Sequence, residues 1–238
     1  AKRIKSYLGE YIDEKELLKR PQFEIAKNFD PVFKPNFMGE GKWRDKPIHK
    51  ILASMIRRRP RDLVKLCTMA ARTARVNRHE LIDTVDWRDN FDSYSQERIQ
   101  DTINEYKSEL PDIGRLLMGM RPSKWEKTSA EAFVYSTEDL FKKIGQILEK
   151  GDFVFTKGTT ASIEELAAFL YKINFLVARK REFQSEYINR RYFEEQKYLL
   201  NNFVDFGYQW EVHPAFRWAL YPDAGLKMYE NLFLDDEF

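Results

Sequence analysis

The chain has 238 residues, of which 43% are hydrophobic, so it is long enough to bury a core of its own. Lys and Arg number 40 against 38 Asp and Glu, and the resulting net charge of +2 excludes a uniformly basic protein; any basic surface must be local. The single cysteine, Cys67, excludes an intrachain disulfide and a zinc site built from several cysteines.

The sequence gives no sign of a membrane or secreted protein. No apolar run approaches the roughly 18–20 residues that span a bilayer. The opening segment Ala1-Lys2-Arg3-Ile4-Lys5 leads directly into charged sequence and lacks the apolar stretch of a signal peptide. We therefore expect a cytoplasmic protein with no membrane partner, which also fits the low cysteine content.

Residues 1–47 are predicted to be a helical and then irregular lead-in. Residues 2–28 carry a rough apolar helical face, which Pro21 interrupts. Residues 29–47 are rich in proline and glycine, which predicts an irregular segment. This segment should pack onto its neighbours through its aromatic side chains, which are Phe29, Phe33, Phe37 and Trp43.

Residues 48–135 are predicted to form a helical, lid-like subdomain. The apolar spacing predicts helices over 48–57, from Pro60 to about Val76, around Leu81 and Val85, from Ser93 to Leu110, and over 112–120. The start at Ser93 rests on the capping-box pattern Ser93-Tyr94-Ser95-Gln96.

Residues 136–238 are predicted to form a winged-helix domain with a small β-hairpin. The expected elements are a helix up to Leu148, a short strand at 153–155, a helix opened by the capping box Ser162–Glu165, strands at 175–178 and 210–213, and a last helix from Pro214. The long stretch between the two late strands would be an extended wing. The predicted fold class is therefore mainly α, a helical bundle followed by a winged helix.

An arginine-rich run opens the second predicted helix, at Arg57-Arg58-Arg59-Pro60-Arg61. Cations at a helix N-terminus oppose the helix dipole, which favours acids there, so helix stability does not account for them. An anionic partner, above all a phosphate, is one explanation. The alternative is a solvated basic junction paired with Asp45 and Asp62.

The segment around Arg61 resembles a known ATPase element. Arg59-Pro60-Arg61-Asp62-Leu63, the alanines at 70, 71 and 74, and Leu81-Ile82 together resemble the "sensor 2" lid of AAA+ and STAND-type ATPases of the origin-recognition kind. The resemblance implies that Arg61 senses the terminal phosphate of a nucleotide, with Arg58 and Arg59 adding positive potential. It also implies a winged helix after the lid, and a bacterial setting such as phage defence.

The chain lacks the part of such an ATPase that binds ATP. The phosphate-binding pattern G-x-x-x-x-G-K-[ST] does not occur in the sequence, and no catalytic residues are predicted. We therefore expect a chain that is not an enzyme by itself and holds no cofactor. ATP and Mg²⁺ would belong to a P-loop ATPase core supplied by a longer parent protein or by a partner chain.

The competing hypothesis is a stand-alone winged-helix protein that binds DNA. Its recognition helix, near Ile163–Tyr171, begins with Glu164-Glu165, which is unfavourable for contact with phosphates. The candidate nucleic-acid contacts instead follow that helix, at Arg179, Lys180, Arg181, Arg190 and Arg191. The acidic recognition helix favours a winged helix that contacts protein over one that contacts DNA.

Other residues that could carry chemistry have simpler explanations. His49, His79 and His213 are scattered and suggest no metal site. Asp83, Asp86 and Asp89 share a helical spacing that is typical of a solvated acidic face. The aromatic stretch at 183–198 could stack single-stranded bases, but such stretches more often pack onto their own domain.

Overall fold

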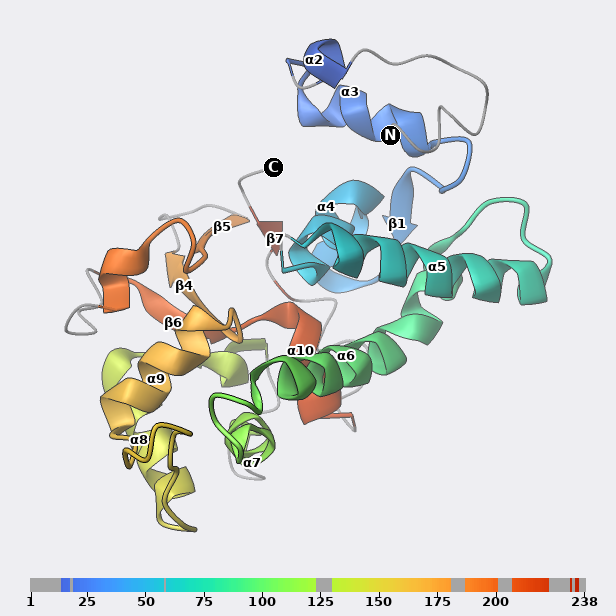
Figure 1. Cartoon of the computed structure of the whole chain (residues 1–238). Helices are drawn as coiled ribbons and strands as arrows, with labels where there is room; N and C mark the ends of the chain where they lie inside the picture. Colours follow the sequence, from blue (N-terminus) through green and yellow to red (C-terminus); the bar gives the residue numbers. More distant parts are fainter. Residues whose placement is uncertain are drawn as a thin grey trace.

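The structure is a computed structural model that describes residues 14–17, 19–57, 59–122, 130–180, 187–200, 207–222, 232 and 234–235. Over these residues the fold is mainly helical with two small sheets, which confirms the predicted class (Figure 1). None of the helices found in these ranges is both long and apolar enough to cross a bilayer.

The N-terminal part contains more regular structure than the sequence predicted. Two short helices, α2 (Glu14–Leu17) and α3 (Gln22–Ala26), precede a hairpin of β1 (Asn36–Met38) and β2 (Arg44–Pro47). The expected irregular segment at 29–47 is therefore partly wrong. Its aromatic packing is confirmed, because Phe37 and Trp43 are buried with ring centroids 5.6 Å apart. The expected helix over 2–13 lies outside the described residues.

The next helices are α4 (Ile48–Met55), α5 (Pro60–Asn77), α6 (Thr84–Tyr106) and α7 (Ile113–Gly119). The separate helix start predicted at Ser93 is wrong, because α6 runs through it without a break. The cap lies at Asp83, whose side chain accepts the backbone N–H of Val85 at 3.0 Å. Ser95 has another role, since its hydroxyl oxygen accepts the N–H of Ala219 in α10 (Pro214–Leu220).

The C-terminal part builds a sheet covered by two helices. In chain order its elements are β3 (Val134–Tyr135), α8 (Thr137–Leu148), α9 (Ile163–Lys172), β4 (Leu176–Lys180), β5 (Tyr187–Arg191), β6 (Gln209–Val212), α10 (Pro214–Leu220) and β7 (Leu234–Asp235). The sheet order is β3-β6-β4-β5-β7, antiparallel except for the last pair.

Several predictions for this part are confirmed. The capping box at Ser162 is present, with Ser162 Oγ and the Glu165 carboxylate each accepting the other's backbone N–H. The strands expected at 175–178 and 210–213 are present as β4 and β6. The strand expected at 153–155 is reduced to an isolated bridge between Val154 and Thr160.

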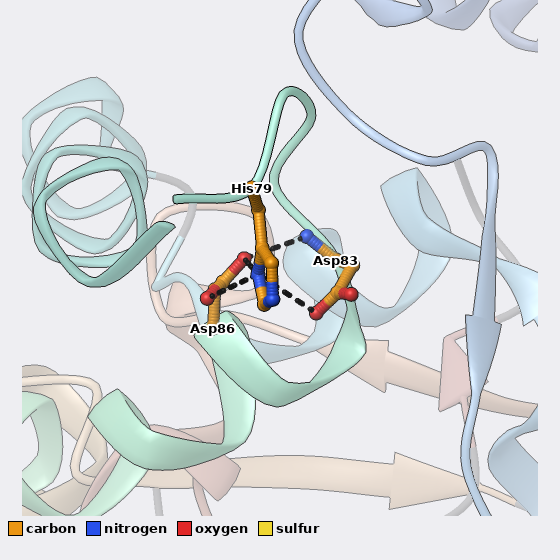
Figure 2. Close-up of side chains that lie close together, drawn as sticks. All are labelled: His79, Asp83 and Asp86. Atoms are coloured by element: carbon orange, nitrogen blue, oxygen red, sulfur yellow. Dashed lines mark hydrogen bonds and ion pairs between the residues drawn. The ribbon is translucent and has the colours of Figure 1, made fainter. Parts of the chain in front are cut away.

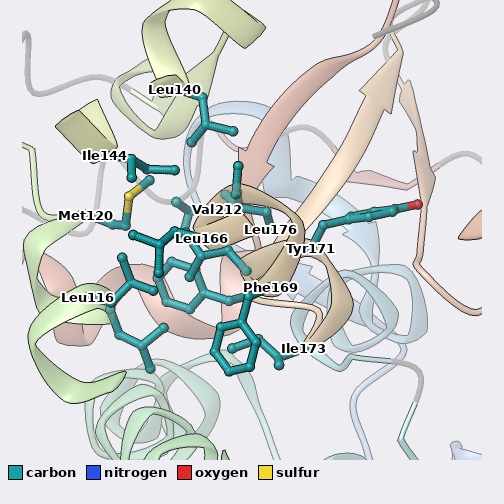
Figure 3. Packing of buried hydrophobic residues seen from close by; sticks show 14 of the residues in the cluster. Leu116, Met120, Leu140, Ile144, Leu166, Phe169, Tyr171, Ile173, Leu176 and Val212 are labelled. Carbon is teal, nitrogen blue, oxygen red and sulfur yellow. The ribbon is translucent and has the colours of Figure 1, made fainter. Parts of the chain in front are cut away.

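Two hydrophobic cores divide the described chain. One joins the β1–β2 hairpin, α4, α5, the first half of α6 and Leu234 of β7, and the other joins α7, α8, α9, β3, β4 and β6 (Figure 3). Helices α6 and α10 contribute to both, for example through Phe91 and Ile99 on α6 and through Trp218 and Phe216 on α10. The two cores therefore meet along α6, between Tyr94 of one core and Ile99 of the other.

Candidate functional site at the start of helix α5

A buried carboxylate fixes the start of α5. Pro60 occupies the first turn, where its missing N–H costs no hydrogen bond. In the same turn Asp62 is fully buried, and its two oxygens accept from Arg57 Nε at 3.0 Å and from Arg98 Nη1 at 2.6 Å. Arg98 lies on α6, so the ion pairs tie the first turn of α5 to its neighbouring helix.

Arg57 extends this network to a third helix. Its Nη1 donates to Thr102 Oγ1 at 3.0 Å, and its guanidinium carbon lies 5.1 Å from the ring centre of Phe216 on α10. Burial by itself would raise the pKa of Asp62, but Arg57 and Arg98 outweigh it and hold that pKa below its ordinary value. The carboxylate is therefore ionised, and Arg57 has a structural role inside the protein.

The next two described arginines of the run lie at the surface and share one carboxylate. Arg59 Nη1 and Arg61 Nη2 lie 2.8 Å and 2.9 Å from Glu105 Oε2. The side chain of Arg61 keeps 58% of its surface exposed, against 22% for Arg59. Because one negative charge faces two positive ones, the pair keeps a net positive charge that can attract an anion.

Burial would lower the pKa of Arg59, but the hydrogen bonds that Arg59 donates to Glu105 and Tyr106 raise that pKa above its ordinary value. Burial would likewise raise the pKa of Glu105, and the bonded Arg59 and Arg61 lower it instead. Arg59 and Glu105 are therefore both charged near neutral pH.

Arg61 also borders an open groove along α5. The groove has a volume of about 500 Å³ and is lined by Pro60, Arg61, Val64, Lys65, Thr68, Met69 and Arg72. The structure thus brings Arg59 and Arg61 together beside open space, and Arg58 lies outside the described residues. Asp45, the other partner expected for these arginines, accepts a hydrogen bond from Asn36 Nδ2 at 3.0 Å, and no ion pair joins it to an arginine among the described residues.

The candidate nucleic-acid residues of the C-terminal part are placed differently from the expectation. Arg190 is completely buried, and its guanidinium donates to both oxygens of Glu211 at 3.0 Å and 3.1 Å. Arg179 is also buried and pairs with Glu131 at 3.2 Å. Burial withdraws both arginines from any contact with a phosphate backbone, which corrects their assignment. Lys180 is exposed, Arg191 is half-buried, and Arg181 lies outside the described residues.

Glu211 is the centre of a second buried network that the sequence analysis missed. Besides Arg190 it pairs with Arg217 Nη2, and Arg217 Nε also donates to the carbonyl of Val212 at 2.8 Å. Burial would raise the pKa of Glu211, but the surrounding arginines lower it to about 2. The only sequence signal for this network was an acidic residue between the apolar Trp210 and Val212 of a predicted strand.

His79, Asp83 and Asp86 form a cluster at the start of α6 that was not expected either (Figure 2). Their ligand atoms lie within 4.8 Å of one another, a spacing that a metal ion could use. Donors already surround the carboxylates: the N–H of Asp83 and His79 Nδ1 lie 3.0 Å and 2.9 Å from Asp86 Oδ2. Lys34 Nζ lies 3.2 Å from Asp83 Oδ2. The cluster is therefore a helix cap closed by a histidine, which replaces the solvated acidic face expected for Asp83 and Asp86.

Comparison with known proteins finds a similarity in the N-terminal part of the chain. Residues 13–103 match the family model of the FunZ-associated C-terminal helical domain. No curated protein and no solved structure matches the chain. The matched residues include the whole of α5, its groove and nearly all of α6, whereas α8, α9 and the larger sheet lie beyond them. The region that holds the Arg59–Arg61 pair is thus similar to the FunZ-associated C-terminal helical domain.

Proposed function

We propose that this chain is a non-catalytic, accessory part of a P-loop ATPase, in which Arg61 contacts the terminal phosphate of a nucleotide held by a separate core. The match to a domain described as C-terminal and associated supports an accessory part of a larger protein. The observation that carries the specific proposal is an arginine that is 58% exposed beside an open groove, in a helix turn fixed by the buried Asp62.

The geometry supports a simple exchange of partners. In the free chain Glu105 holds Arg59 and Arg61 in one place, so little side-chain freedom remains to be lost when a phosphate arrives. A phosphate accepts two parallel hydrogen bonds from a guanidinium. Arg61 would turn from Glu105 to the phosphate, while Arg59 stays on the carboxylate.

Two helices offer a route from this turn to the C-terminal part. Arg57 and Arg98 connect Asp62 to Phe216 on α10 and to α6, and both helices enter both cores. A tilt of α5 on nucleotide binding would therefore move α10 and the sheet behind it.

The order β3-β6-β4 with α8 and α9 supports a winged helix as the element that moves. The exposed first turn of α9 carries Glu164 and Glu165, and Arg179 and Arg190 are buried. These placements favour a protein contact for the winged helix over the competing stand-alone DNA-binding function.

The test is the ATPase rate of the assembly that joins this chain to its P-loop core. We expect Arg61→Ala to lower kcat by about tenfold or more, because a cation that meets the terminal phosphate stabilises charge in the transition state. Arg61→Lys should restore part of the rate, because lysine restores the positive charge but lacks the planar guanidinium that donates two parallel hydrogen bonds. Lys142→Ala, on the exposed side of α8, serves as the control and should leave the rate unchanged. The chain alone should turn over no ATP. An unchanged rate in Arg61→Ala would reject the proposed role.

A further inference from the structure

The outer face of α5 carries charges of one sign along its whole length. The charged residues of this helix are Arg61, Asp62, Lys65, Arg72 and Arg75, and Asp62 is the buried one. At 100° per residue the four cations fall within an arc of about 80°, and at 1.5 Å per residue Arg61 and Arg75 lie about 21 Å apart. The row is opposite Leu66, Ala70 and Ala74, which pack into the core.

The two ends of this row differ in their partners. Arg61 pairs with Glu105, and Lys65 pairs with Glu97 at 2.8 Å, so α6 supplies an acid to each. Within the described part of the chain, no ion pair or hydrogen bond holds the side chains of Arg72 and Arg75. The helix dipole accounts for a cation in the last turn, at Arg75, but not for Arg72 further back.

The exposed face of α8 is built differently. On α8, Lys142 lies 2.8 Å from Glu138, one turn away on the same helix. Such mixed pairs are typical of a solvated face. Helix α5 carries no exposed acid, so its charged face is not a mixed, solvated one. A row of cations of this kind attracts a polyanion, and this attraction explains the composition of the face.

From this face we infer a second site: the Arg72–Arg75 end of α5 binds the phosphate backbone of duplex DNA. The short side chains of Thr68 and Ala71 beside the row leave room for a strand of phosphates to lie against the helix. Arginine suits phosphate because its fork donates two parallel hydrogen bonds. Helix α5 contains no aromatic residue that could stack an unpaired base, which favours a duplex over a single strand.

This inference is independent of the nucleotide role of Arg61 and differs from the DNA contacts expected at Arg179 and Arg190. Contacts to phosphates carry no sequence information, so binding should not depend on the DNA sequence. Because each phosphate contact releases counterions, it adds about 0.9 to the slope of log affinity against log salt concentration.

The test is fluorescence anisotropy of this chain with a short, random-sequence DNA duplex between about 50 and 200 mM salt. We expect binding that weakens steeply with salt. In Arg72→Ala/Arg75→Ala the slope should fall by about 1.8 and the affinity at the lowest salt by about tenfold or more. Circular dichroism should show an unchanged fold, since both side chains are exposed and alanine favours helix.

The control is Lys150→Ala/Lys157→Ala, which removes the same charge from the exposed loop between α8 and α9. This variant should leave the slope of log affinity against log salt concentration unchanged. An equal fall in slope in both double variants would overturn the site, as would no binding by the unaltered chain. Binding of a polyglutamate peptide in place of the duplex would also overturn it, because the partner would then be an acidic protein.

Discussion

Two buried ion-pair networks of similar build hold the two halves of the molecule, and they differ in how they connect to exposed residues. Each places one carboxylate between two guanidiniums: Asp62 between Arg57 and Arg98, and Glu211 between Arg190 and Arg217. In the second network all three side chains are at most 2% exposed. In the first, Arg98 also reaches the exposed Asp101 at 2.8 Å.

The difference shows what each network can do. Among the described residues, Glu211 on β6 joins Arg190 on β5 to Arg217 on α10, so this network stabilises the joint between the sheet and α10. The Asp62 network stands one residue from Arg61, so it fixes the backbone beneath an exposed cation. A buried ion pair is often a poor source of net stability, yet removing one partner is costly because the other charge remains buried.

Glu211→Gln should have the largest effect on stability. It removes the carboxylate that lies between the buried guanidiniums of Arg190 and Arg217, which should lower the free energy of unfolding by about 3–5 kcal/mol. Urea denaturation measures this loss. Glu138→Gln removes an exposed acid from the surface of α8 and should cost about 0.5 kcal/mol or less. Equal losses in the two variants would mean that burial does not govern the network.

The same network should appear in the pH dependence of stability. The pKa of Glu211 is about 2 in the folded chain, below its ordinary value of 4.5, so the unfolded chain binds the proton more readily. The contribution of Glu211 is therefore fully present above pH 4.5 and is lost as the pH falls towards 2. Glu211→Gln should flatten the stability curve in this window, and an unchanged acid slope would contradict the assignment.

Asp62→Asn should destabilise the chain less, by about 2–3 kcal/mol, because Arg98 keeps Asp101 and only Arg57 is left without a charged partner. Urea denaturation again gives the loss. The double variant Asp62→Asn/Asp101→Asn also removes the second acidic partner of Arg98. Its loss of unfolding free energy should approach that expected for Glu211→Gln. If Asp62→Asn alone already lowers the free energy of unfolding as much as Glu211→Gln, then the exposed partner Asp101 does not soften the loss and the contrast between the two networks is wrong.

The smallest effect is expected at the start of α6. Hydrogen bonding to Asp86 raises the pKa of His79, so its stabilising contribution is present below its ordinary value of 6.5 and is lost as the pH rises through the folded value. His79→Gln should lower the melting temperature in mild acid and leave it unchanged in mild alkali. Melting curves from about pH 6 to pH 9 test this, and an equal change at both ends would exclude a charged histidine in the cap.

The sequence predicted those elements whose signals are local. The spacing of Ile48, Ile51 and Leu52 predicted α4, and the capping pattern at Ser162 predicted α9. The β1–β2 hairpin and β5 were missed because charged residues obscure their period of two. The second helix predicted inside α6 failed because a capping pattern also occurs by chance in the middle of a helix.

The functional arginines show the same limit more sharply. Arg59, Arg61, Arg179 and Arg190 look alike in the sequence, and their exposure depends on carboxylates far away along the chain. The partner of Arg190 is 21 residues distant and that of Arg179 is 48. Only the folded chain brings such partners together, so a run of arginines cannot by itself separate a surface for phosphate from a buried ion pair.

The most direct test of the Arg61 role is an experimental structure of the assembly that joins this chain to its P-loop core, with a non-hydrolysable ATP analogue bound. The proposal predicts the Arg61 guanidinium at about 2.7–2.9 Å from an oxygen of the terminal phosphate, with Arg59 still on Glu105. Arg61 still bound to Glu105, with the nucleotide remote from α5, would contradict it.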